Sequence, residues 1–154
     1  MTTTITGATG IDNIQAATGA VLQVVSAASS TAQTVATVHW TDTGLTASIT
    51  PSSSSSKIKV DYVFLSIYFA LAQTGASFRV VRDSTALYTP SAGYAIWSST
   101  ASWYGNYSDM ELDSPSTTSA ITYKIQVRCY DTKAILISDS SQYRNSITLT
   151  EIAG

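Results

Sequence analysis

The sequence predicts an all-β protein, a single antiparallel β-sandwich of jelly-roll-like form, and three observations support this. The segment 121–130 alternates strictly between apolar and polar side chains, which is the period of a strand with one buried face. About ten short segments follow one another at 8–12-residue spacing, separated by turn residues, as in sandwiches and barrels. The 24 serines and 23 threonines keep the surface polar, while 44% hydrophobic residues and 15 aromatic side chains suffice for a core.

Residues 1–19 predict an extended arm ahead of one domain that covers residues 20–154. The segment is small, polar and interrupted by glycine, and Ile5, Ile11 and Ile14 are isolated apolar positions that cannot form a core of their own. The arm is either a frayed terminus or a segment that becomes ordered against a partner. The three isoleucines are its candidate contacts.

Strands are expected where period-two or β-branched segments lie between turn residues such as Asp42-Thr43-Gly44. The segment 94–107 is aromatic-rich, and its period is too poor to assign. The expected strands cover residues 21–26, 33–40, 45–50, 57–72, 77–82, 85–88, 109–112, 121–130, 134–138 and 145–152.

The strand expected over 121–130 gives the clearest division into two faces. Its outward side chains are polar or amphipathic, and its only thiol lies on the apolar face. A single cysteine excludes an internal disulfide, and we expect a buried, inert thiol. The inward set is Ile121, Tyr123, Ile125, Val127 and Cys129, and the outward set is Thr122, Lys124, Gln126, Arg128 and Tyr130.

The segment 57–72 is the longest apolar stretch, and its buried face changes along its length. Early positions such as Ile58 and Phe64 share one face, whereas the later apolar residues occupy the other. The chain either changes its buried face at a bulge or bend near residues 62–65, or passes from one buried face to two. The segment is then either a central strand or a strand whose second face is covered by another subunit. A helix is disfavoured because β-branched and aromatic residues dominate and helix caps are absent. The candidate subunit-interface residues are Val63, Leu65, Ile67 and Phe69, with Leu71 on the same face.

The composition disfavours several functional classes. A net charge of −2 with scattered lysines and arginines gives no electrostatic footprint for nucleic acid. No run approaches 18 apolar residues, so membrane insertion is not expected. The N-terminus lacks the charged and apolar regions of a signal peptide.

The residues of enzymatic sites are scarce in this chain, so we expect no enzyme and no cofactor. His39 is the single imidazole, and there is no nucleophile elbow, P-loop or C-x-x-C motif. Asp109, Glu111 and Asp113 form the one carboxylate group, at alternate positions of one strand face. They could form a solvated face, ion pairs with Lys124, Arg128 or a neighbouring chain, a Ca²⁺ site, or a glycosidase pair. We favour the solvated or ion-paired alternative.

Aromatic side chains gather between residues 94 and 107. Flat rings on loops can stack on sugars, and tyrosine and tryptophan are frequent in interfaces. The same residues could instead pack into the core or against another subunit, and we favour that alternative. The candidate glycan contacts are Tyr94, Trp97, Trp103, Tyr104 and Tyr107.

Five segments resemble, in the same order, a β-sandwich domain that recurs in virion surface proteins of tailed phages, notably phages of aquatic bacteria including cyanobacteria. The resemblance covers roughly residues 20–154, and the family shares a similar S-I-T-L-x-E-I-A ending. The segments are VLQVVSA (21–27), GLTASITPSSSSSKIKV (44–60), VVRDSTAL (80–87), LDSPSTTSAITYKIQVR (112–128) and SSQYRNSITLTEIAG (140–154).

The resemblance implies a homotrimeric module of the virion surface, found in capsid decoration (cement) proteins and at the ends of tail fibres and tailspikes. It supplies no catalytic residues. The implied partners are further copies of the chain, the major capsid protein and a host surface glycan. Trimerisation would also account for the two-faced segment 57–72 and the low charge.

Three functional hypotheses follow. With Met1 as the native start, only about 20 residues precede the domain, and a decoration protein that binds and reinforces the shell is expected, with its arm on the capsid. If the chain is a fragment or a separately encoded tip, a receptor-binding domain of a tail fibre or tailspike is expected. A non-viral lectin or adhesion module is the third hypothesis.

Overall fold

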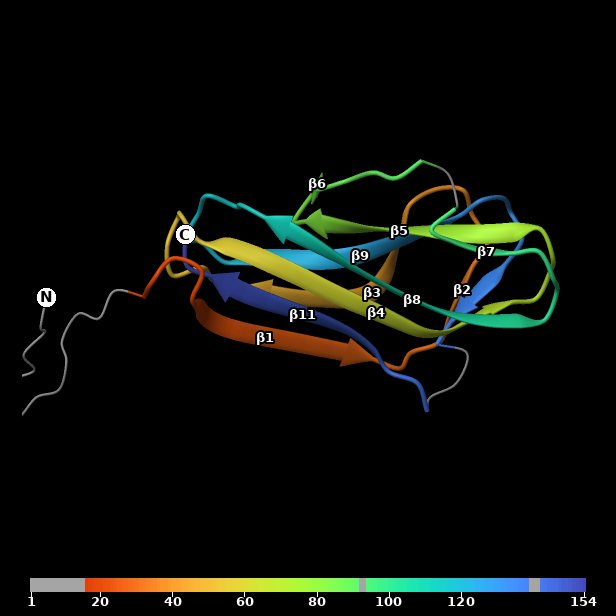
Figure 1. The fold of residues 1–154 in the computed structure, drawn as a ribbon. Helices are drawn as coiled ribbons and strands as arrows, with labels where there is room; N and C mark the ends of the chain where they lie inside the picture. The colour runs from red at the N-terminus through yellow and green to blue at the C-terminus, as the bar shows by residue number, and fades with distance from the viewer. Residues whose placement is uncertain (1–15, 92–93, 139–141) are drawn as a thin grey trace, which may run out of the picture.

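The computed structural model describes residues 16–91, 94–138 and 142–154, and this part of the chain forms two antiparallel β-sheets packed face to face (Figure 1). Every element in these ranges is a strand, turn or loop, as the sequence predicts. No helix of these residues is long and apolar enough to cross a membrane. The all-β sandwich prediction is confirmed.

Sheet A has the order β1-β11-β4-β10-β2, and β8 pairs with the other edge of β4. Because β4 is long, it pairs first with β11 and then, past a break in register, with the short β10. The strands of this sheet are β1 (Val21–Ser29), β2 (Gln33–Val35), β4 (Lys57–Phe69), β8 (Trp103–Asp113), β10 (Ile135–Ile137) and β11 (Asn145–Ile152).

Sheet B has the order β3-β9-β5-β6, and β7 also pairs with β5. The strands of this sheet are β3 (Thr41–Ile49), β5 (Thr74–Arg82), β6 (Thr85–Ala86), β7 (Ile96–Ser98) and β9 (Ile121–Cys129). The topology becomes clear when the short β2 and β10 are omitted and β6 and β7 are counted as one interrupted strand. If the remaining strands are numbered 1 to 8 in chain order, one sheet has the order 1-8-3-6 and the other has the order 2-7-4-5. This is the jelly-roll arrangement of two Greek keys.

The core lies between the two sheets and is built from alternate residues of every long strand. In β9 the predicted alternation holds along the whole strand: Tyr123, Ile125 and Val127 are fully buried, and the intervening polar side chains are half-buried. Cys129 is a free, buried thiol that contacts the Val35 carbonyl at 3.3 Å, and burial raises its pKa. The thiol is therefore placed as the sequence predicts.

A β-bulge in β4 changes the buried face of the strand. The register with β8 shifts between Phe64 and Ile67, and Ser66 adopts a left-handed backbone conformation with φ 60°. Such a conformation costs a non-glycine residue roughly 1–2 kcal/mol. The amide oxygen of Asn145 accepts the Leu65 N–H at 2.9 Å, and that of Asn106 accepts the Ser66 N–H at 3.0 Å, so the bulge is held from both neighbouring strands.

The bulge corrects part of the subunit-interface prediction. Ile67 and Phe69 are fully buried inside this chain's own core, so no second subunit is needed to cover them. Val63 and Leu65 point the other way and are half-buried on the outside of sheet A. Only these two remain candidates for an interface.

Several strand boundaries differ from the prediction. β8 begins at Trp103 rather than at residue 109, because its aromatic half pairs with the second half of β4. β3 runs through the predicted turn, since Gly44 (φ 76°) lies in an irregularity between Asp42 and Thr46 that the strand accommodates. Of the segment 33–40, only Gln33–Val35 is a strand.

The described chain enters the sandwich beside its C-terminus. Gly19 N–H donates to the Ala153 carbonyl and Ala153 N–H to the Ala20 carbonyl, both at 2.8 Å, which joins the start of β1 to the end of β11 (Figure 1). The candidate arm contacts Ile5, Ile11 and Ile14 lie outside the described residues.

Candidate functional site

The outer face of sheet A is poor in charge and rich in exposed apolar side chains. We call it the A face: the outward side chains of β1, β11, β4 and β8. Its ionisable side chains are Lys57, Lys59 and Asp61, and the last two neutralise each other in an ion pair of 2.8 Å. Its exposed or half-buried apolar side chains are Val21, Leu22, Val24, Val63, Leu65, Met110, Leu112 and Ile152.

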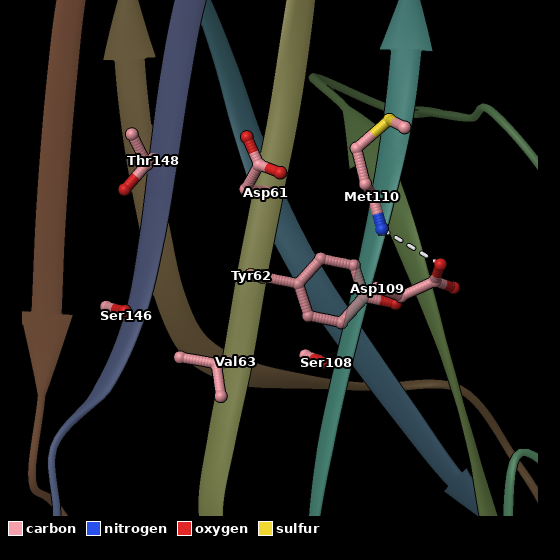
Figure 2. A pocket seen from close by; sticks show the side chains of 8 residues that line it. All are labelled: Asp61, Tyr62, Val63, Ser108, Asp109, Met110, Ser146 and Thr148. Carbon is pink, nitrogen blue, oxygen red and sulfur yellow. Dashed lines mark hydrogen bonds between the residues drawn. The ribbon is translucent and has the colours of Figure 1, made fainter.

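The strand register aligns the outward side chains of the A face in rows. Ser26, Thr148, Asp61 and Met110 lie in one row across the four strands. A shallow, open depression of about 470 Å³ crosses this row and the next one. Figure 2 shows its small side chains, Ser146 and Thr148 of β11 and Ser108 of β8, lying beside Asp61 and Val63 of β4. The lining also includes the carboxylates of Asp61 and Asp109, so the depression combines apolar contact with a few polar groups.

Edge strand β8 presents its apolar side chains to the outside. Met110 and Leu112 are about half exposed on the A face. By the same alternation, Asp109, Glu111 and Asp113 lie on the inner side of the edge, in register with Tyr62, Val60 and Ile58 of β4. Exposure of apolar groups on a surface strand, with the charges turned away, is typical of a contact surface.

The acidic residues of β8 have different contacts. Asp113 forms an ion pair with Arg82 of sheet B at 2.7 Å and accepts the Tyr123 hydroxyl at 2.6 Å, which ties the two sheets together. Asp109 accepts the Tyr107 hydroxyl at 3.0 Å. The sequence-based choice of Lys124 and Arg128 as ion-pair partners of these carboxylates is wrong. Lys124 pairs with Asp42, and Arg128 lies on the outside of sheet B.

The described residues contain no group of three or more His, Cys, Asp or Glu side chains that could hold a metal ion. His39 is exposed before β3. The carboxylate of nearby Asp42 is held by Lys124 at 2.9 Å and Gln126 at 2.6 Å, and these hydrogen bonds lower the pKa of Asp42. The carboxylate is therefore engaged by groups other than the imidazole.

The five candidate glycan contacts lie in two separate places, three on β8 and two in a cluster on sheet B. Tyr107 is half-buried, and its ring stacks on Phe78 of the core at 4.8 Å. Trp103 and Tyr104, at the start of β8, pack on Phe69 and Tyr68 of β4 at 5.4 and 4.6 Å.

Tyr94 and Trp97 instead form a cluster with Tyr130, with ring centroids 5.1–5.6 Å apart. Tyr94 is 61% and Tyr130 40% exposed.

A second group of side chains on sheet B was not predicted from the sequence. The guanidinium groups of Arg79 and Arg128 lie over the ring of Trp40, at 4.4 and 4.9 Å from its centroid. The available signal was the outward position of Arg128, but the strand that brings Trp40 beside it could not be read from periodicity. We call these residues with the aromatic cluster the B patch: Trp40, Arg79, Arg128, Tyr94, Trp97 and Tyr130.

Glu151 is a fully buried carboxylate at the end of β11. It accepts hydrogen bonds from Gln23 Nε2 at 2.6 Å and from the backbone N–H and hydroxyl of Ser52, both at 2.7 Å. Burial alone would raise its pKa, but these hydrogen bonds outweigh burial and lower the pKa of Glu151 to about 2. The group joins β1, β11 and the serine-rich loop, and its role is structural.

No protein-family model matches the chain, and no curated protein matches it. Function is therefore inferred from the two outer faces and from the resemblance of the five sequence segments.

Proposed function

We propose that the chain is a capsid decoration protein, a non-enzymatic homotrimer that binds the outer surface of a phage shell and reinforces it. The proposal rests on the resemblance of five ordered segments to phage virion β-sandwich domains. It is supported by a single jelly-roll domain whose long strands form one complete core. The implied localisation is the virion, without nucleic-acid binding or membrane insertion.

The observation that supports self-association is the A face, whereas the number of three copies is what the resemblance implies. Its apolar side chains are exposed in a single chain, and burying them would contribute about 25 cal/mol for each Å² removed from water. Its Lys59–Asp61 ion pair is already formed within the chain, so a partner need not supply charges. The proposed occupant is a second copy of the chain, and in a three-fold ring the A face of each copy would contact a different surface of the next copy.

The arm is the proposed link to the capsid. Ile5, Ile11 and Ile14 would contact the major capsid protein, while the folded domain of residues 20–154 would form the trimer. Because Gly19 and Ala20 are hydrogen-bonded to Ala153, the arm would join the domain beside the end of β11.

The oligomeric state tests the A face directly. Light scattering at micromolar concentration should give a mass three times the 16.3 kDa of one chain. Met110→Lys places an unpaired charge in the proposed interface and should yield a folded monomer. The matched control is Thr85→Lys on the exposed edge strand β6, which should remain trimeric. A wild-type monomer, or a trimer that tolerates Met110→Lys, would contradict the interface.

Location on the particle tests the decoration role itself. Immunogold labelling of purified particles should mark the shell in many copies, and removal of residues 1–15 should reduce shell attachment while the domain stays folded. Labelling at the tail tip would instead support the second candidate, a receptor-binding domain. The exposed rings of Tyr94 and Tyr130 are the observation that favours that alternative.

A further inference from the structure

Two arginines of the B patch share one aromatic ring without an ion pair of their own. Arg79 donates from Nε and Nη2 to the amide oxygen of Gln126, at 2.9 and 2.7 Å, and from Nη1 to the hydroxyl of Thr89. Arg128 donates to the Pro90 carbonyl at 3.3 Å, and its Nε is buried without a partner in the described chain. Neither guanidinium forms an ion pair with a carboxylate of the described residues.

The local charge is the opposite of the charge of the whole chain. Asp42, which lies opposite Gln126 as Arg79 does, is bound by Lys124 and Gln126. Asp131, three residues after Arg128, forms an ion pair with Lys133 at 3.1 Å. Arg79, Arg128, Lys124 and Asp42 together therefore carry a net charge of +2, whereas the chain carries −2. Two like charges held next to each other and partly desolvated are stabilised by an anion.

The aromatic part of the patch adjoins Arg128 along β9. Arg128 and Tyr130 are two residues apart on the outward side, roughly 7 Å along the chain. Trp97 lies opposite Gly75 in the register of β7 with β5, and Tyr130 N–H donates to the Gly75 carbonyl. Because Gly75 has no side chain, the rings of Trp97 and Tyr130 meet over it at 5.1 Å, and Tyr94 completes the cluster.

We propose that the B patch is a binding site for a carboxylate-bearing saccharide, such as a uronic-acid polymer. A sugar ring would stack on the exposed faces of Tyr94, Trp97 and Tyr130, and the sugar carboxylate would accept hydrogen bonds from the Arg128 guanidinium. A planar carboxylate matches the fork of a guanidinium in a way that a neutral hydroxyl does not. The site goes beyond the decoration role, because it would operate on the shell or at the tail tip.

Calorimetric titration of the full chain with oligogalacturonate tests the site. Binding is expected, and the methyl ester of the same oligosaccharide, which keeps the rings and removes the charge, should bind at least tenfold more weakly. Arg128→Gln should weaken binding by about tenfold, the loss typical of one charge-assisted hydrogen bond. Trp97→Ala should weaken it through the independent loss of ring stacking.

Arg144→Gln is the matched control, because it removes the same charge from an exposed position beside β11 of sheet A. Its affinity for oligogalacturonate should equal that of the wild type. Equal binding of the methyl ester, an equal loss in Arg144→Gln, or no binding of either oligosaccharide would overturn the proposal. Tighter binding of a single-stranded oligonucleotide would also overturn it in favour of nucleic acid. None of these outcomes depends on where the protein lies on a particle.

Discussion

The two outer faces of the sandwich differ in the kind of group that lacks a matching partner within the described chain: apolar groups on one face and guanidinium charges on the other. On the A face the Lys59–Asp61 charges are paired within the chain, and apolar groups such as Met110 and Leu112 are exposed to water. On the B patch the rings are already in contact with one another, and neither Arg79 nor Arg128 forms an ion pair with a carboxylate of the residues that the structure describes. An exposed apolar surface favours a protein partner, whereas an unpaired guanidinium pair favours an anion. On these two proposals, assembly and ligand recognition would lie on opposite sheets of the same fold.

The largest expected effect on folding comes from a charge placed in the core beneath the A face, and a charge on the A face itself serves as the comparison. Ile67→Asp would bury a carboxylate without a partner, which costs several kcal/mol, and we expect no cooperatively folded protein. Leu65→Asp lies two residues away on the other side of the bulge and should fold as a monomer. Circular dichroism during heating measures folding, and light scattering measures assembly.

The comparison between these two variants is decisive for the A face. If Leu65→Asp also unfolds, the outward side of β4 is part of the core rather than a contact surface. If Leu65→Asp folds as a trimer, the interface lies elsewhere on the molecule.

The face change in β4 shows what the sequence could and could not predict. The alternation shows that the buried face changes between Ile58 and Ile67, and a bulge or bend near residues 62–65 was one of the two alternatives that it left open. The structure places the bulge between Phe64 and Ile67. Its anchors, Asn106 and Asn145, lie far away in sequence, and nothing in the local pattern indicates that their side chains meet β4. That Ile67 is buried in this chain's own core also depends on how β4 pairs with strands that are distant in sequence.

A smaller loss of folding stability is expected at acidic pH, because the buried carboxylate of Glu151 would become protonated. The pKa of folded Glu151, about 2, lies below the ordinary value of 4.5, so its contribution to stability is present above pH 4.5. As the pH falls from 4.5 towards 2, roughly 3 kcal/mol should be lost. Urea unfolding at pH 7 and pH 3 measures the part lost by pH 3, roughly 2 kcal/mol. Glu151→Gln should be less stable at pH 7 and should lose less on acidification; an unchanged pH dependence would contradict the role of this carboxylate.

The smallest expected effect concerns the B patch. Trp40→Leu removes two cation–π contacts at a half-exposed position, and we expect a loss of about 1 kcal/mol in the free energy of unfolding. The oligomeric state should not change, because the substitution lies on sheet B. Dissociation of the trimer by this variant would mean that both faces take part in assembly. Thermal unfolding and light scattering on the same sample measure both quantities.

Prediction of the B patch from sequence failed for a physical reason. The outward positions of Arg128 and Tyr130 follow from the period of β9, and Trp97 lies in a segment already recognised as aromatic. Which strands flank β9 is decided by the jelly-roll topology, which places β3 on one side and β5 on the other. Only that pairing brings Trp40 and Arg79 to Arg128, and periodicity carries no information about it.

Cys129 gives the molecule a practical property as well as a packing role. It is the chain's single thiol, it is 1% exposed, and its raised pKa keeps it protonated at neutral pH. A cysteine introduced at Thr150 on the A face, or at Thr122 on sheet B, would therefore be the only thiol open to a maleimide dye. One fluorophore per chain could then report solvent exposure of either face separately, on free protein and on intact particles, without first removing a native cysteine.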